Sequence, residues 1–155
     1  MISKETIKFI AKVTIAHVAT YMICGMIFAT ILDYEAHIEL IGFKSMDEIS
    51  GLTVILAQIV RGILFGIVIW WIKDSIIGKR LAWLKLWAIL VIVGIISVYA
   101  PAPGSIEGFI YLAPVDDLPL TLELSGLEVL LQPLLFSIIV TYQRKKKREK
   151  QKDHE

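Results

Sequence analysis

Arg61 stands inside a long apolar run, where an ionisable side chain is unusual. It falls about nine residues into its segment, so it would lie near the middle of a bilayer if that segment spans one as a helix. An arginine at that depth costs roughly 2.5 to 3.5 kcal/mol on insertion scales and normally faces protein or water. Two interpretations stay open: a structural arginine that fixes helix packing, and a functional arginine that contacts a solute.

Other polar residues fall where they could meet Arg61. Gln58 precedes Arg61 by three positions and therefore shares its helix face. In the last apolar segment, Glu128 and Gln132 precede Pro133, which cannot donate the usual helical hydrogen bond. Gln132 should lie near Arg61 in depth, and Glu128 one turn closer to the outside. We predict a polar cluster with an Arg61–Glu128 contact, or failing that an Arg61–Gln132 contact.

Gly62 and Gly66 form a pair of small residues one helical turn apart, next to this polar stripe. Such a pair allows another helix to approach closely, and it leaves a surface that lipid chains fill poorly. We therefore predict that both glycines pack against a neighbouring helix. The pattern is common and indicates a contact, not a chemical activity.

His17 and Cys24 are the residues of the first apolar segment that could bind a metal or react. Haem in a helical bundle usually needs a second axial ligand, yet His37 and His154 lie outside the apolar segments. We predict a hydrogen-bonded packing role for His17 and an inert buried thiol for Cys24, because nothing cationic is placed beside it. We expect no metal and no cofactor.

Acidic residues of the third connection are the remaining candidates for chemistry: Glu107, Asp116 and Asp117. These carboxylates could serve as acids or bases for a lipid-active enzyme at the outer face. The sequence contains no glycine-rich phosphate loop, no zinc-ligand cluster and no Ser/His/Asp set. A protein without catalytic activity is therefore the favoured interpretation, and a lipid-active enzyme the weaker one.

The elements that must position these residues are four long apolar segments. The chain has 155 residues, of which 56 % are hydrophobic, and its mean hydropathy is +0.70. Each segment has about the length that a helix needs to cross a bilayer. The segments are residues 9–32, 52–72, 81–100 and 124–142. We predict an all-α integral membrane protein, a four-transmembrane-helix bundle that forms one domain over residues 1–142.

Charge alternates between the connections and indicates the topology. Lys and Arg outnumber the acids in the head, the second connection and the tail, whereas acids dominate the first and third connections. Lys44 is the only base in either acidic connection. Because cytoplasmic loops retain Lys and Arg, we expect both termini on the cytoplasmic side of the plasma membrane.

The third connection, residues 101–125, is long and rich in proline and cannot form one helix. Residues 106–112 are apolar apart from Glu107, and residues 118–124 alternate leucine with mostly polar residues. Apolar groups at this position need cover from lipid headgroups or from the helices. We predict a structured extracytoplasmic loop between the third and fourth helices, lying on the outer membrane surface.

The partners that the sequence suggests are lipid and other membrane proteins. The tail, residues 143–155, is polybasic over 144–152; this pattern is typical of a topological stop signal, and it could also bind anionic lipid headgroups. No nucleic-acid partner is expected. We predict a non-enzymatic accessory or interaction subunit. The alternative is a homo-oligomeric transporter or channel for an anionic solute, with Arg61 in the pathway.

Overall fold

The computed structural model describes residues 3–32, 48, 50–98, 102, 105–111 and 120–152. The elements in these residues are all helical, which confirms the all-helical prediction for this part of the chain. Residues 33–47 and 112–119, with Asp116 and Asp117, lie outside it, as do the side chains of the tail. The helices are α1 (Lys4–Leu32), α3 (Gly51–Ile76), α4 (Ala82–Val91), the π-helix η3 (Ile92–Ile96), α5 (Ile106–Tyr111) and α6 (Leu120–Lys152).

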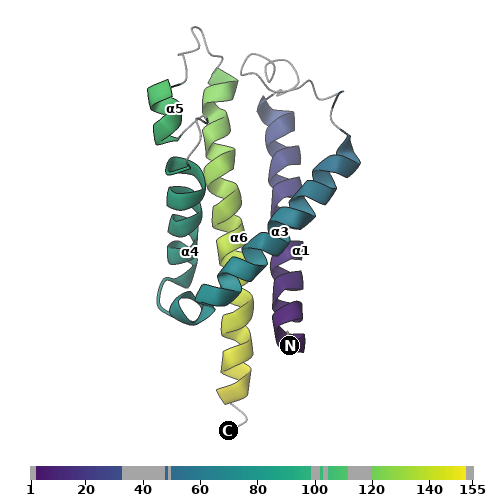
Figure 1. The fold of residues 1–155 in the computed structure, drawn as a ribbon, viewed down its shortest axis with the longest axis vertical. Coiled ribbons are helices and arrows are strands. Elements are labelled where there is room, and N and C mark those ends of the chain that lie inside the picture. The colour runs from purple at the N-terminus through teal and green to yellow at the C-terminus, as the bar shows by residue number, and fades with distance from the viewer. Residues whose placement is uncertain are drawn as a thin grey trace.

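The long helices run alternately in opposite directions (Figure 1). α3 crosses α1 obliquely, and α6 packs against α1 and α4. The first turn of α1, the turn between α3 and α4 and the C-terminal end of α6 lie at one end of the molecule. α5 and the start of α6 lie at the other end.

Local sequence signals explain why two helices begin earlier than the apolar segments. Ser3 caps α1, since its hydroxyl accepts a hydrogen bond from the backbone N–H of Thr6 at 3.1 Å. α6 starts directly after Pro119, a residue that favours a helix start. Leucines at 120, 124, 127 and 131 also follow a helical spacing, so residues 120–124 belong to α6 and not to the loop predicted there.

A tight turn joins α3 to α4. The N–H of Ile77 donates to the carbonyl of Lys73 at 2.7 Å, and the N–H of Lys79 donates to that of Ile76 at 3.2 Å. The turn needs two residues with positive φ: Gly78 at 78° and Leu81 at 58°. Glycine adopts this conformation freely, whereas leucine is strained in it.

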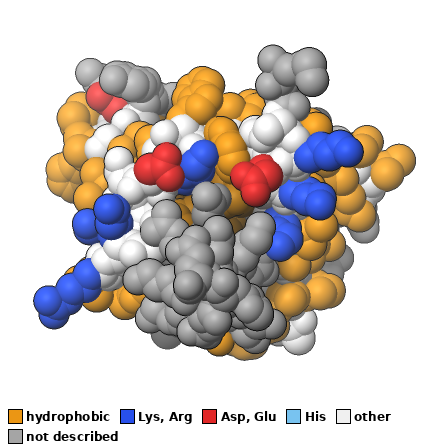
Figure 2. All heavy atoms as spheres, turned by 90° about the horizontal axis from the view of Figure 1, so that it is seen from below, with side chains coloured by type: hydrophobic (Ala, Val, Ile, Leu, Met, Phe, Trp, Pro, Cys, Tyr) orange, Lys and Arg blue, Asp and Glu red, His pale blue; other side chains and the backbone are white. Residues whose placement is uncertain are grey.

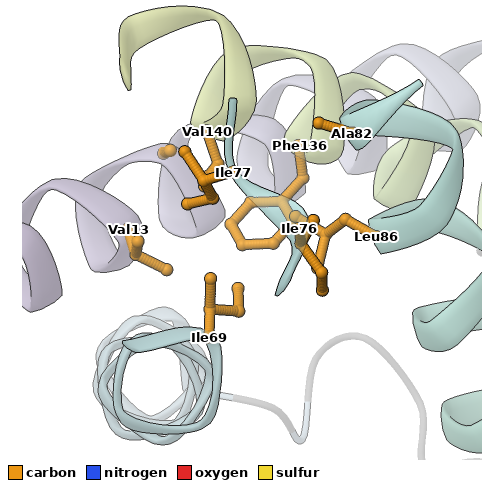
Figure 3. Packing of buried hydrophobic residues seen from close by; sticks show 9 residues of the cluster. Val13, Ile69, Ile76, Ile77, Ala82, Leu86, Phe136 and Val140 are labelled. Atoms are coloured by element: carbon orange, nitrogen blue, oxygen red, sulfur yellow. The ribbon is translucent and has the colours of Figure 1, made fainter. Parts of the chain in front are cut away.

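The core lies near this turn, where α1, α3, α4 and α6 meet (Figure 3). The ring of Phe136 from α6 lies among Ile76 and Ile77 of the α3 end and Leu86 of α4. These four side chains are at most 4 % exposed. The core therefore ties the second connection to α6, while the middle of α3, at Gly62 and Gly66, packs on α1.

The apolar surface outside this core is large. α1 and α3 are long and apolar enough to cross a membrane, and only 22 % of the apolar window of each is buried. Two shorter apolar helices follow, Ala82–Ile96 and Gly126–Tyr142. Among the described residues, exposed large hydrophobic side chains outnumber the buried ones.

Candidate functional site

A hydrogen bond between His17 and Gln58 lies at the centre of the candidate site. The His17 Nε2 and Gln58 Oε1 atoms are 3.1 Å apart, and the two residues are 3 % and 9 % exposed. Because the amide oxygen only accepts, Nε2 carries the hydrogen in this arrangement. The structure thus gives His17 the hydrogen-bonded packing role expected of it, and its partner comes from α3.

Aromatic rings surround the His17 imidazole on two further sides. Phe65 of α3 packs edge-on against it, with ring centroids 5.0 Å apart and an interplanar angle of 82°. Phe136 of α6 does the same at 5.8 Å and 86°. Phe65 and Phe136 are themselves 5.9 Å apart. We call the rings of His17, Phe65 and Phe136, together with the Gln58 amide that bonds to His17, the aromatic cluster. It joins α1, α3 and α6.

Arg61 lies at the edge of the aromatic cluster. Its guanidinium carbon is 5.5 Å from the centroid of the Phe65 ring, a cation–π distance. The Arg61 residue is exposed, while Gln58, one turn earlier in α3, is buried against α1. The two residues that were predicted to share a face therefore have different surroundings.

Glu128 and Gln132 are half-buried on α6. The Glu128 Oε1 atom lies beside Gly25 of α1, 3.8 Å from the position that a Cβ atom would take there. Gly25 is eight residues from His17, or about 12 Å along the helix. The structure thus places Arg61 beside Phe65 and a Glu128 oxygen beside Gly25, and the predicted Arg61–Glu128 pair stays a prediction.

Gly62 and Gly66 lie where α3 crosses α1. A Cβ atom at Gly62 would be 2.9 Å from the Thr14 Cα, and one at Gly66 would be 3.0 Å from the Ile10 Cα. Real Cβ contacts are essentially never as short as 2.9 Å, so the absence of side chains allows this backbone approach. The structure thereby places both glycines against a neighbouring helix.

Hydroxyl groups near the site bond to their own helices. Thr14 donates to the Ile10 carbonyl and Thr20 to the Ala16 carbonyl, both at 2.9 Å. This back-bonding satisfies a hydroxyl without water. Ser137 is fully buried, and among the described residues its Oγ atom has no hydrogen-bond partner.

Trp87 has a contact that the sequence did not suggest. Its indole N–H donates to the carbonyl of Leu130 at 3.0 Å and so links α4 to α6. Leu130 is three residues before Pro133, where the helical hydrogen-bond pattern is interrupted. Pro133 leaves the carbonyl of Val129, the residue before Leu130, without its helical donor, so the proline marked this turn of α6 but not Leu130 as the acceptor.

The acidic residues proposed for catalysis are only partly described. Glu107 is half-buried in the six-residue helix α5. Among the described residues, no three His, Cys, Asp or Glu side chains are grouped to hold a metal ion. Comparisons with protein-family models, with curated proteins and with solved structures found no match for this chain.

Proposed function

We propose that this chain is an integral membrane protein that crosses the bilayer four times. The exposed apolar surface supports this proposal, because a soluble protein rarely exposes apolar patches larger than a few hundred Å². α1 and α3 are long enough to cross. α4 with η3, and the middle of α6, would supply the two remaining spans, the third of them short.

The distribution of charge supports a cytoplasmic position for both termini in the plasma membrane. The described bases other than Arg61 lie toward the end that contains the first turn of α1 and the α3–α4 turn, and Figure 2 shows Lys and Arg side chains spread across that end. Glu48 and Glu107 belong to the connections at the opposite end. The described bases concerned are Lys4, Lys8, Lys12, Lys73, Lys79, Arg80 and Lys85.

Within the membrane, we propose that the protein is a non-enzymatic accessory or interaction subunit. The observation that carries this proposal is the use of the polar groups between the helices. His17 and Gln58 bond to each other, and the Thr14 and Thr20 hydroxyls bond to backbone carbonyls. These groups hold helices together, and the large apolar surface stays free for other membrane proteins.

The exposed guanidinium of Arg61 is the observation that favours the rival function, an oligomeric anion channel or transporter. Arg61 side chains from several copies would then line a shared pathway. This function requires a symmetric assembly, because one chain of this size encloses little space.

Cysteine accessibility tests the topology. In a Cys24→Ala background, Lys79→Cys should react with a membrane-impermeant maleimide only after the cells are permeabilised, since Lys79 lies in the α3–α4 turn. Glu107→Cys should react in intact cells. Labelling of Lys79→Cys in intact cells would contradict the orientation, and extraction of the protein by alkaline carbonate would contradict membrane integration.

The interaction role is tested by size and flux measurements on the purified protein. We expect a monomer of 17.5 kDa in mild detergent and no anion flux above that of empty vesicles. In native membranes, a photo-crosslinker at Leu64, an exposed position of α3, should give one discrete adduct with a different protein. A symmetric oligomer with flux that Arg61→Met abolishes would establish the rival function instead.

A further inference from the structure

The position of Arg61 along α3 decides which anion can meet it. The Arg61 guanidinium carbon lies 5.5 Å from the centroid of the Phe65 ring, and Phe65 follows Arg61 by one turn on the same side of α3. Arg61 is about 15 Å from Gly51 at the start of α3 and about 22 Å from Ile76 at its end. The guanidinium beside Phe65 therefore lies within the apolar middle of the helix.

The surface around this guanidinium is exposed and apolar. Leu64 and Val68 follow Arg61 by three and seven residues and share its side of the helix. Leu64 is 57 % exposed and Val68 is 48 % exposed. We call Arg61, Leu64 and Val68 the Arg61 face. A partner that covers this face must combine apolar groups with one negatively charged hydrogen-bond acceptor.

The aromatic cluster fixes the position of the guanidinium but does not satisfy it. The Phe65 ring packs against His17 and Phe136, so it offers the guanidinium a rigid surface. A ring attracts the charge but accepts few of the five N–H donors. A carboxylate accepts two of them in parallel, in the geometry that arginine favours.

We propose that the Arg61 face binds a transmembrane helix of another protein, one that carries an Asp or Glu near the middle of the bilayer. This inference rests on the proposed function and names the chemistry of the partner. Leu64 and Val68 would pack against apolar side chains of that helix, and Arg61 would pair with its carboxylate. The depth of Arg61 favours such a helix over lipid headgroups, which lie about 15 Å away along α3.

The test uses a polyleucine transmembrane peptide of about 23 residues with one central Glu, and a matched peptide with Gln. The wild-type protein and each peptide are reconstituted in neutral phosphatidylcholine vesicles at about pH 8, and association is measured by energy transfer between labels. We expect the Glu peptide to bind about tenfold more tightly than the Gln peptide. Arg61→Met should reduce this ratio to about one, whereas Arg61→Lys should keep a preference for Glu.

The ratio of the affinities of the wild-type protein for the Glu and Gln peptides is measured without any variant, so misfolding of Arg61→Met cannot obscure the result. Leu56→Met, at an exposed position away from the Arg61 face, is the matched control and should leave the ratio unchanged. Equal binding of both peptides by the wild-type protein would overturn the inference. Energy transfer between two copies of the protein, abolished by Arg61→Met, would also overturn it, because Arg61 would then bind a second copy. Loss of the preference for the Glu peptide when anionic lipid is added would overturn it as well, because Arg61 would then bind lipid headgroups. If both peptides bind equally but the photo-crosslinker at Leu64 still gives an adduct in native membranes, the proposed interaction role would remain and the acidic partner helix would be ruled out.

Discussion

The Nε2 atom of His17 and the Oε1 atom of Gln58 are 3.1 Å apart, and their hydrogen bond fixes the register between α1 and α3. The next contact along the crossing is between Thr14 and Gly62, where the helix backbones approach closely. The two contacts have complementary physical roles. The glycine permits the approach, and the hydrogen bond selects one alignment of helices whose apolar surfaces alone would pack in several.

We predict that Gln58→Met destabilises the protein, because it removes the acceptor that faces the buried His17 ring. The loss of unfolding free energy should be about 1 kcal/mol, since hydrogen bonds between membrane helices contribute roughly 0.6 to 2 kcal/mol. Thermal unfolding in mild detergent measures it, with the exposed Leu56→Met as control. A double-mutant cycle with His17→Phe should show coupling between the two positions. Unchanged stability in Gln58→Met would contradict the structural role of the bond.

We predict that Gly62→Ala is strongly destabilising, because its Cβ would lie 2.9 Å from the Cα of Thr14 and the helices would have to separate. Overpacking of this kind typically costs about 1 to 3 kcal/mol. Gly126→Ala in α6 is the matched control: nothing lies within 4 Å of its added methyl group, so stability should stay the same or rise by up to about 1 kcal/mol. Equal effects of both substitutions on thermal unfolding would rule out a close approach at Gly62.

We predict that Leu81→Gly stabilises the α3–α4 turn. Leu81 has φ 58° and ψ 34°, a left-handed conformation that costs a non-glycine residue roughly 1 to 2 kcal/mol. Gly78 has φ 78°, so Gly78→Ala should act in the opposite direction, with a loss of about 1 kcal/mol. The two variants should shift the midpoint of thermal unfolding in opposite directions. A fall in stability with Leu81→Gly would show that the side chain contributes more by packing than the backbone loses by strain.

The sequence predicted the helices well, because apolar length and interrupting residues act locally. The described residues of the apolar segments lie within helices, apart from Leu81, which precedes α4, and residues 97–98, which follow η3. The helix ends were less predictable, since they depend on local capping such as that by Ser3. The π-helical end of the third apolar segment has no recognised sequence signal, although its five residues include Gly94.

The candidate site was predictable by residue type but not by partner. His17, Gln58 and Arg61 were identifiable as polar residues within apolar segments. The pairing of His17 with Gln58 depends on how α1 and α3 align, and hydrophobic periodicity does not determine the alignment of two helices that cross obliquely. The direction of Arg61 toward Phe65 is a choice of side-chain rotamer, which residue spacing does not specify either.

A double-mutant cycle with Arg61→Met and Glu128→Gln tests whether these two residues pair within one chain. Arg61 extends toward Phe65, whereas Glu128 lies beside Gly25, about 12 Å along α1 from the level of His17. If Arg61 pairs with a helix of another protein, as proposed, the two losses of unfolding free energy in detergent should be additive within about 0.5 kcal/mol, as for independent sites. A buried pair would behave differently, because each single variant would leave an uncompensated charge and lose about 3 to 5 kcal/mol, while the double variant would lose less than the sum. Coupling above about 1 kcal/mol would establish the intrachain pair that the sequence suggested, and it would remove Arg61 as the binding point for another helix.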